Sequence, residues 1–190
     1  MSATFDEADA VLKTERLTLR VLRESDLEAI WPYVADAEIS RFMSWVPHDS
    51  MEETRAFISD VRRRMAEGVT IAWIIEEQGN VCGLVSLIGI VRKHRALHYD
   101  KAELAYWLGR DFRGRGIATE ACEAVLRYAF NRLDLNKIVV AHVTQNDASR
   151  DLILRLGFRC VGTEYQHFSK EGQWFDHVLY ELLRTAWLQR

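Results

Sequence analysis

The stretch RGRGIATEA at residues 113–121 constrains the fold more than any other part of the sequence, because two glycines join a strand pattern directly to a helix pattern. Glycine leaves the backbone bare, so that a ligand can approach it closely. The first amides of a helix have no partner within the helix, and the helix dipole is positive there. The turn therefore predicts a site for an anion, such as a phosphate, at the start of a helix.

Two well-known phosphate motifs do not fit this turn. A P-loop needs Lys followed by Ser or Thr after its second glycine, and Ile117 and Ala118 stand there instead. A dinucleotide-binding turn needs a third glycine and an acidic residue about 20 positions later. Glu120 replaces that glycine, and the next strand pattern, at 137–143, ends without a carboxylate. The turn is therefore either a phosphate site of another class or a plain connection that uses glycine for its geometry.

Composition excludes several classes of function. The 190 residues are 48% hydrophobic with a net charge of −3, which fits one compact domain and argues against nucleic acid as the main ligand. Three scattered cysteines, Cys82, Cys122 and Cys160, have no metal-ligand spacing and suit a reducing compartment. The acidic N-terminus has no apolar core of a signal peptide, and the longest apolar run, 81–91, is too short to cross a bilayer. We expect a cytoplasmic protein without a metal or a membrane span.

Hydrophobic periodicity and turn residues predict one mixed sheet with helices, an α/β domain. A helix over 24–39 is expected to begin near Ser25 and to be kinked or split by Pro32, and Ser50 with Glu53 predicts a capping box. The polar segment 92–100 has no period and predicts a mobile loop. The remaining expected elements are strands at 16–22, 70–77, 81–91, 101–109, 137–143, 158–168 and 174–183, and helices at 50–68, 117–133 and 146–156.

The residues around the glycine turn resemble those of a known family. Arg113, Gly116 and Ala118 fit the pattern R-x-x-G-x-A, which is similar to the pyrophosphate loop of the GNAT superfamily of acyl-CoA N-acyltransferases. AELAYWLGRDFRGRGIATEA, NDASRDLILRLGF, MSWVPHDSMEETRAFI and QWFDHVLYELLRTAW resemble the RimJ/RimL branch, which acetylates N-terminal amines of ribosomal proteins. The resemblance implies an N-terminal tail at 1–13 and a single GNAT domain at 14–190. That fold has a central mixed, mostly antiparallel, twisted sheet flanked by helices.

The resemblance also implies where acetyl-CoA binds. Its pyrophosphate is expected on the backbone amides of Arg113, Gly114, Arg115, Gly116, Ile117, Ala118 and Thr119. Its pantetheine arm is expected along the strand before the loop, at Tyr106, Trp107 and Leu108, where one main-chain amide would hold the developing oxyanion. The family places an Asn at the start of the next helix, here Asn146, which is equally well read as a helix N-cap. Ser149 is expected to contact the cofactor or to protonate the leaving thiolate.

Glu103 is the candidate base, because a carboxylate on an otherwise apolar strand is costly unless it is paired or functional. The alternatives are a structural role, as a salt bridge or a hydrogen-bonded carboxylate, and a proton relay through ordered water. Many GNAT enzymes have a tyrosine as general acid four residues before the glycine of LGF, and here Ile153 takes that position. Water or Ser149 would then serve as the acid.

The acceptor is left open among a ribosomal-protein N-terminus, another peptide, an amino acid, a polyamine and an aminoglycoside. The family implies that residues 25–65 and 92–100 set this choice. His48, His177, Trp31, Phe42 and Trp45 are candidate contacts, with polar surface or core packing as the alternative. A homodimer is the family's expectation, and a cofactor-binding module without turnover is the alternative to an enzyme.

Overall fold

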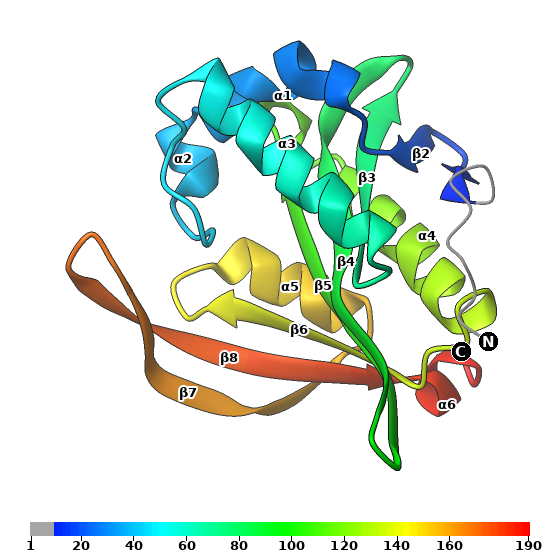
Figure 1. The fold of residues 1–190 in the computed structure, drawn as a ribbon. Helices are drawn as coiled ribbons and strands as arrows, with labels where there is room; N and C mark the ends of the chain where they lie inside the picture. Colours follow the sequence, from blue (N-terminus) through cyan, green and yellow to red (C-terminus); the bar gives the residue numbers. More distant parts are fainter. Residues whose placement is uncertain (1–9) are drawn as a thin grey trace.

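The structure, a computed structural model, describes residues 10–190, and residues 1–9 of the expected N-terminal tail lie outside the described residues. Its centre is an eight-stranded sheet in the order β1-β2-β3-β4-β5-β6-β8-β7 (Figure 1). Neighbouring strands are antiparallel except for β5 and β6, which are parallel. The strands are β1 (Leu12–Lys13), β2 (Leu17–Val21), β3 (Thr70–Glu77), β4 (Asn80–His94), β5 (Leu97–Leu108), β6 (Lys137–Val143), β7 (Arg159–Lys170) and β8 (Gln173–Leu183).

Helices pack on this sheet, so the predicted α/β class and the mostly antiparallel mixed sheet are confirmed. The long helices are α3, α4 and α5, which all begin at turns that the sequence predicts. Short helices precede α3 and close the chain. The helices are α1 (Leu27–Val34), α2 (Ala37–Ser40), α3 (Met51–Ala66), α4 (Ile117–Asn131), α5 (Asp147–Arg155) and α6 (Arg184–Trp187).

The first helical region is split where the sequence does not predict it. Pro32 is the sixth residue of α1 and does not end the helix, which continues to Val34. The break comes later, where Asp36 caps α2 by accepting from the amide of Glu38 at 2.8 Å. Ser25 makes no cap, because Asp26 instead accepts from the amide of Arg23 at 2.8 Å.

At the start of α3, Ser50 caps the helix as predicted, but Glu53 bonds to the amide before the cap, so the predicted capping box forms only in part. Ser50 Oγ accepts from the amide of Glu53 at 3.2 Å, and the Glu53 carboxylate accepts from the amide of Asp49 at 2.9 Å. Two otherwise unpaired amides at the helix start are satisfied in this way.

The two faces of the sheet are covered by different helices. Side chains alternate between faces along a strand, and paired residues share a face. Trp73 of β3 contacts Tyr128 of α4 on one face, and Trp107 of β5 contacts Tyr33 of α1 on the other. We call these the α4 face, which also carries α5, and the α3 face, which also carries α1. Each half of the core therefore has its own helical layer.

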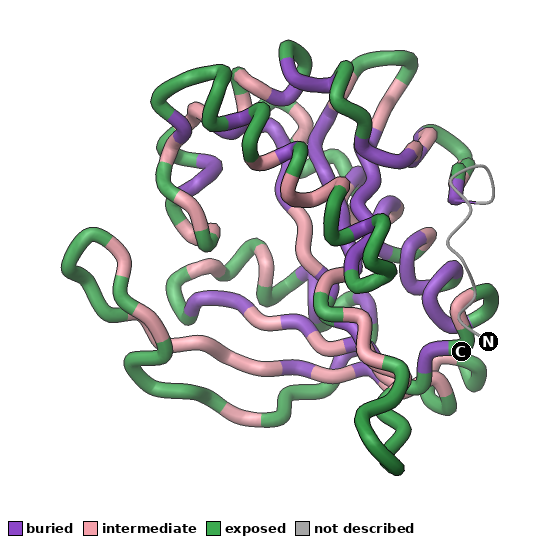
Figure 2. The backbone as a smooth tube through the Cα atoms, in the orientation of Figure 1, coloured by how far each residue is buried: buried purple, intermediate pink, exposed green. Residues whose placement is uncertain are grey.

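The core is densest around the middle strands. Figure 2 shows buried backbone concentrated in β2, β3, β4 and α4, whereas β7 at the sheet edge is largely exposed. The N-terminal segment joins this core, since Ala10 is fully buried and its carbonyl accepts a hydrogen bond of 2.6 Å from the Trp73 indole. The packed part of the chain therefore includes residues that precede β2.

The prediction of a mobile loop at 92–100 is wrong. β4 continues to His94 and β5 starts at Leu97, and the two strands form a hairpin in which Lys93 pairs with His98. The hairpin projects from the bottom of the molecule in Figure 1 and its side chains are largely exposed. Because water contacts both of its faces, no hydrophobic alternation marks it as a strand pair.

We predict that Gly83 is required because the backbone of β5 leaves no room for a side chain at this position of β4. A Cβ atom on Gly83 would lie 2.2 Å from the carbonyl oxygen of Trp107, which is backbone and is fixed by the sheet. Gly83→Ala should lower the free energy of unfolding by about 1–3 kcal/mol in urea denaturation. Gly162→Ala on β7 is the control, since a Cβ there meets nothing within 4 Å. Equal stability of the two variants would contradict this close approach.

Candidate active site

The sheet opens between β5 and β6. The two strands pair only from Lys101 to Glu103 of β5 and from Lys137 to Val139 of β6. Beyond these residues β5 stays paired with β4 and β6 stays paired with β8, and Figure 1 shows the two strands diverging. Within the described residues, the β5 edge from Leu104 to Leu108 therefore has no partner strand on this side, and the backbone groups of its alternate residues, Leu104, Tyr106 and Leu108, face the gap.

The glycine turn ends at the start of α4, next to this gap. Gly114 and Gly116 have φ angles of 71° and 77°, a left-handed conformation that disfavours residues with a Cβ atom. Gly116 is the N-cap of α4, and no side chain caps this end of the helix. The first amides of α4 are therefore available to a ligand, as the sequence predicts.

Side chains on either side of the turn fix its conformation. The fully buried Ile117 anchors the first turn of α4 in the core, and Ala118 packs partly against it. Arg113 pairs with Glu38 at 3.0 Å, and Arg115 pairs with Glu77 at 2.6 Å. Both arginines point to protein carboxylates, so the backbone is what the turn presents to a ligand.

A second support comes from β2 and its preceding residues. Arg16 donates to the carbonyl of Arg115 at 3.0 Å and pairs with Glu120 at 2.6 Å. Thr14 Oγ1 donates to the same carboxylate at 2.6 Å. These contacts hold the turn against the strand that lies beside α4.

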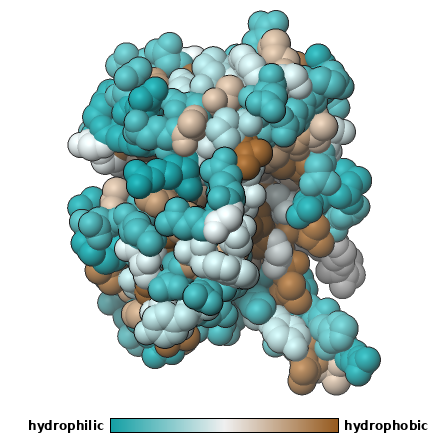
Figure 3. Space-filling view, turned by 90° about the vertical axis from the view of Figure 1, so that its left-hand side faces the viewer, coloured by the Kyte–Doolittle hydropathy of each residue, from teal (hydrophilic) through white to brown (hydrophobic). Residues whose placement is uncertain are grey.

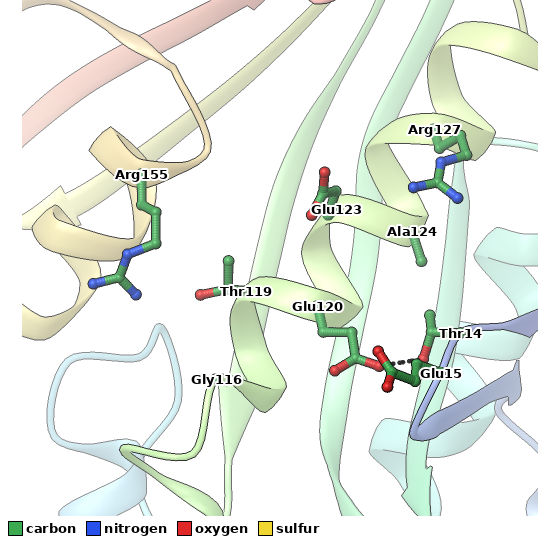
Figure 4. A pocket seen from close by; sticks show the side chains of 9 residues that line it. All are labelled: Thr14, Glu15, Gly116, Thr119, Glu120, Glu123, Ala124, Arg127 and Arg155. Atoms are coloured by element: carbon green, nitrogen blue, oxygen red, sulfur yellow. Dashed lines mark hydrogen bonds between the residues drawn. The ribbon is translucent and has the colours of Figure 1, made fainter. Parts of the chain in front are cut away.

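A depression of about 460 Å³ extends along α4 from the glycine turn. Figure 4 shows Arg155 of α5 on one side and Thr14 and Glu15 on the other, with α4 between them, where Glu120 accepts a hydrogen bond from Thr14. The depression is open to solvent and starts at Gly116. It can therefore hold the exposed part of an elongated ligand whose anionic group sits at the turn.

Tyr106 and Ser149 meet across the gap. The Tyr106 hydroxyl on β5 and Ser149 Oγ on α5 are 2.7 Å apart, on the α4 face. Burial raises the pKa of Tyr106 far above its ordinary value, so the hydroxyl stays protonated at neutral pH. Asn146 Oδ1 accepts from the amide of Ser149 at 3.2 Å and caps α5, which fixes the serine in place. The resemblance implies a role only for the main chain of Tyr106, and nothing in the sequence points to its hydroxyl.

The other two residues expected on the cofactor strand are packed into the protein. Trp107 is buried on the α3 face, where its ring centroid lies 5.7 Å from that of Tyr33, and Leu108 is buried on the α4 face. Their side chains build the core. The main-chain groups of Leu108 face the gap, whereas those of Trp107 point toward its β4 partner, Leu84.

Glu103 lies at the point where the gap begins, on the α3 face. It is the last β5 residue paired with β6, and it lies on the opposite side of the sheet from Tyr106. Its side chain reaches solvent, yet the surrounding protein raises its pKa by desolvation, an effect that the charge of His167 partly offsets. Among the described residues it has no ion pair, so the predicted salt-bridge alternative is not the arrangement here.

The β7–β8 hairpin places a group of rings on the side of Glu103. His167 and His177 stack with their centroids 4.8 Å apart, and Phe168 lies 5.3 Å from His177. Burial is the main cause that lowers the pKa of His177, and the charge of His167 lowers it further. This imidazole is therefore neutral at pH 7. By contrast, His48 is buried and bonded to Thr54 Oγ1 at 2.9 Å, which makes it part of the packing of α3.

Two kinds of feature are not found in the described part of the chain. Between residues 10 and 190, no group of three or more His, Cys, Asp or Glu side chains is placed to hold a metal ion. No helix in that range is long and apolar enough to cross a membrane.

The fold and this site define an acyltransferase. Residues 16–159 match the family described as acetyltransferase (GNAT) domain, so the chain belongs to the GNAT acetyltransferases, as the resemblance implied. The chain is 25% identical over 184 residues to the [ribosomal protein uS5]-alanine N-acetyltransferase of Escherichia coli (strain K12), covering 93% of this chain and 92% of that protein.

Two further similarities bear on the acceptor and the fold. The chain is 26% identical over 161 residues to the spermidine N(1)-acetyltransferase of Escherichia coli (strain K12), covering 84% of this chain and 82% of that protein. It superposes with a TM-score of 0.84 on RimL, a ribosomal L7/L12 alpha-N-protein acetyltransferase solved in complex with coenzyme A. That match has 24% identity and covers 93% of this chain and 99% of the RimL chain.

We predict that the bare backbone of Gly116 is needed for coenzyme A binding. Gly116→Val puts a branched side chain at a φ of 77° beside the free amides, and should lower coenzyme A affinity at least tenfold in calorimetric titration. Gly79→Val is the matched control, because Gly79 has a φ of 81° in the β3–β4 turn and therefore imposes similar strain elsewhere. If both variants bind coenzyme A equally well, the loop is not the pyrophosphate site.

Proposed function

We propose that this enzyme transfers the acetyl group of acetyl-CoA to a primary amine, and that the amine is the N-terminus of a protein or peptide. The observation that carries the proposal is the gap that opens after Glu103, with free strand edge on β5 and a free helix start at Gly116. An extended thioester arm fits along such an edge as an added strand, and a pyrophosphate fits such a helix start.

The residues present fit acetyl-CoA at both ends. The amides from Arg113 to Thr119 hold the pyrophosphate, and the β5 edge from Tyr106 to Leu108 binds the pantetheine arm. Asn146 keeps its amide nitrogen for the same arm, because only its oxygen is used in capping α5. The thioester carbonyl then lies beside a main-chain amide of β5, which stabilises negative charge on its oxygen.

The two faces of the sheet divide the proton transfers. The amine nitrogen attacks the thioester carbonyl carbon, and the carbon–sulfur bond breaks. On the α4 face, the leaving sulfur takes a proton from the Ser149–Tyr106 pair, whose hydroxyls lie 2.7 Å apart. On the α3 face, the proton lost by the amine passes through water to Glu103, whose raised pKa makes it a better proton acceptor than an ordinary carboxylate.

The acceptor assignment rests on similarity and on the open α3 face beside Glu103. The similar proteins include acetyltransferases named for ribosomal proteins. The N-terminal amine of a ribosomal protein is attached to a whole protein, so it needs a site that opens to solvent. A polyamine is the second candidate acceptor, because a spermidine acetyltransferase is similar over most of the chain. We further propose that the enzyme acts in the cytoplasm. We also propose that it forms a homodimer, and sedimentation velocity tests this oligomeric state.

An acceptor panel tests the proposal directly. The enzyme is incubated with acetyl-CoA and, separately, with N-terminal peptides of ribosomal proteins, spermidine, free amino acids and an aminoglycoside, and released thiol and product mass are measured. Peptide N-terminal acetylation with the highest kcat/KM is the expected result. Preference for spermidine would replace the acceptor, and no thiol release with any amine would indicate a binding module without turnover.

We predict that Glu103→Gln lowers kcat by about 10²- to 10⁴-fold without lowering stability. The pKa of Glu103 is raised from 4.5, so its ionisation costs folding free energy as pH rises through the folded-state pKa. Removing the charge should leave the melting temperature at pH 7.5 unchanged or higher, with acetyl-CoA affinity unchanged. A variant with normal kcat would remove Glu103 from the reaction.

Glu181→Gln is the matched control for Glu103→Gln. Glu181 lies on the same face, two strands away, but its carboxylate is paired with Arg159 and Lys137. The hydrogen bond from Arg159, then that from Lys137, lowers its pKa, so its ion pairs stabilise the fold above pH 4.5 and are lost as pH falls. This variant should lose melting temperature at neutral pH and keep kcat within about fivefold, or ~1 kcal/mol of barrier.

We predict that Tyr106→Phe lowers kcat by about tenfold or more. In the wild type Ser149 protonates the leaving sulfur and regains its proton from the Tyr106 hydroxyl, and the variant lacks that hydroxyl. Acetyl-CoA affinity should stay within about twofold, since the main chain of β5 is unchanged. Tyr99→Phe on the exposed β4–β5 hairpin is the control. Stopped-flow measurement of thiol release separates the two variants, and equal rates would exclude the Tyr106 hydroxyl from the step.

A further inference from the structure

Lys170 ties the tip of the β7–β8 hairpin to the loop that follows α2. Its ammonium donates to the carbonyl oxygens of Ser40 at 2.6 Å, Trp45 at 2.7 Å and Met43 at 3.3 Å. These carbonyls lie at least 125 positions away in the sequence. We call residues 41–48 the α2–α3 loop. The contact therefore joins two segments that lie far apart along the chain.

The ammonium matches this loop chemically. A lysine has three donors and no acceptor, and it meets three carbonyls. The carbonyls of Met43 and Trp45 belong to the loop, which is neither helix nor strand, and that of Ser40 belongs to the last residue of α2. Such carbonyls depend on partners outside regular secondary structure. Bonds from a charged donor are stronger than those between neutral groups. Lys170 thus supplies hydrogen-bond donors to backbone carbonyls that have no donor from a helix or a sheet.

The position of Lys170 is set by the hairpin. Lys170 pairs with Gln173 across a two-residue turn, in which Glu171 and Gly172 both have positive φ angles, 51° and 79°. Such a turn matches the twist of the flanking strands and gives a defined tip. The lysine therefore approaches the loop from a fixed point.

The loop conformation carries a cost that Lys170 offsets. The indole nitrogen of Trp45 is buried and has no hydrogen-bond partner among the described residues. A buried donor without a partner disfavours the conformation that buries it. The carbonyl of Trp45 accepts a hydrogen bond from Lys170 at 2.7 Å. The cost of the unpaired indole and the stabilisation by the ammonium therefore fall on the same residue.

The contact crosses the side of the sheet on which Glu103 lies. Glu103 pairs with Val139, and along β8 Glu181, Leu179 and His177 share that face. The loop comes from the helical layer of α1 and α3 and reaches the hairpin at Lys170. Figure 3 shows this side of the molecule as largely hydrophilic, with hydrophobic side chains gathered in a hollow between its upper and lower parts.

We propose that Lys170 is a positioning residue for the acceptor: it holds the α2–α3 loop and the β7–β8 hairpin together as one wall of the acceptor site. This role rests on the proposed acetyl transfer. The wall lies on the α3 face, whereas the Tyr106–Ser149 pair lies on the α4 face and the glycine turn lies at the start of α4. Loss of Lys170 therefore changes how the acceptor binds and leaves the acetyl-CoA site intact.

The test uses Lys170→Met, which keeps the length of the stem and removes the charge and the donors. Amide hydrogen exchange at residues 41–48 should become at least tenfold faster. The KM for the acceptor found in the panel should rise at least tenfold, with kcat changed less than threefold and acetyl-CoA affinity unchanged. Lys170→Arg, which keeps several donors, should recover most of the acceptor KM. Lys13→Met on β1, an exposed lysine at the opposite edge of the sheet, is the control and should change none of these quantities.

Three outcomes separate the inference from the proposed function. An active wild-type enzyme with the same acceptor KM in Lys170→Met overturns the role of Lys170 and leaves acetyl transfer standing. A parallel rise in the KM for acetyl-CoA also overturns it, because the defect would then not be confined to the acceptor. A wild-type enzyme that acetylates no amine overturns the proposed function and the acceptor role with it.

Discussion

The short parallel ladder between β5 and β6 is the constraint on which the rest of the site depends. It joins two halves of the sheet through only three residue pairs, ending at Glu103 and Val139. A longer ladder would close the edge of β5 and leave no place for an extended ligand. A shorter one would remove the connection that holds α5 beside β5, and with it the 2.7 Å contact between Tyr106 and Ser149.

This geometry also separates the charges of the site. A strand alternates its side chains, so residues three apart on β5 face opposite ways, as Glu103 and Tyr106 do. Burial raises the pKa of both groups, which leaves a protonated hydroxyl on the α4 face and a carboxylate of increased basicity on the α3 face. In the proposed reaction, the two proton transfers of opposite direction would thus have separate partners.

The sequence predicts the parts of the site that depend on local backbone chemistry. Gly116 at a helix start and Asn146 as an N-cap are readable because each acts on amides within a few residues. The Tyr106 hydroxyl and Lys170 are not readable in this way, since their partners lie 43 and at least 125 positions away. The β4–β5 hairpin at 92–100 escaped prediction for another reason, because its exposed strands need no apolar side chains.

Amide hydrogen exchange of the wild-type protein with and without coenzyme A tests the central claim most directly. If the open β5 edge and the glycine turn form the cofactor site, the amides of residues 106–108 and 114–119 should exchange more slowly when coenzyme A is bound. The β3–β4 turn around Gly79 should be unaffected, as it lies outside the proposed site. Protection of the glycine turn without protection of residues 106–108 would contradict the account, because the gap between β5 and β6 would then not hold the thioester arm.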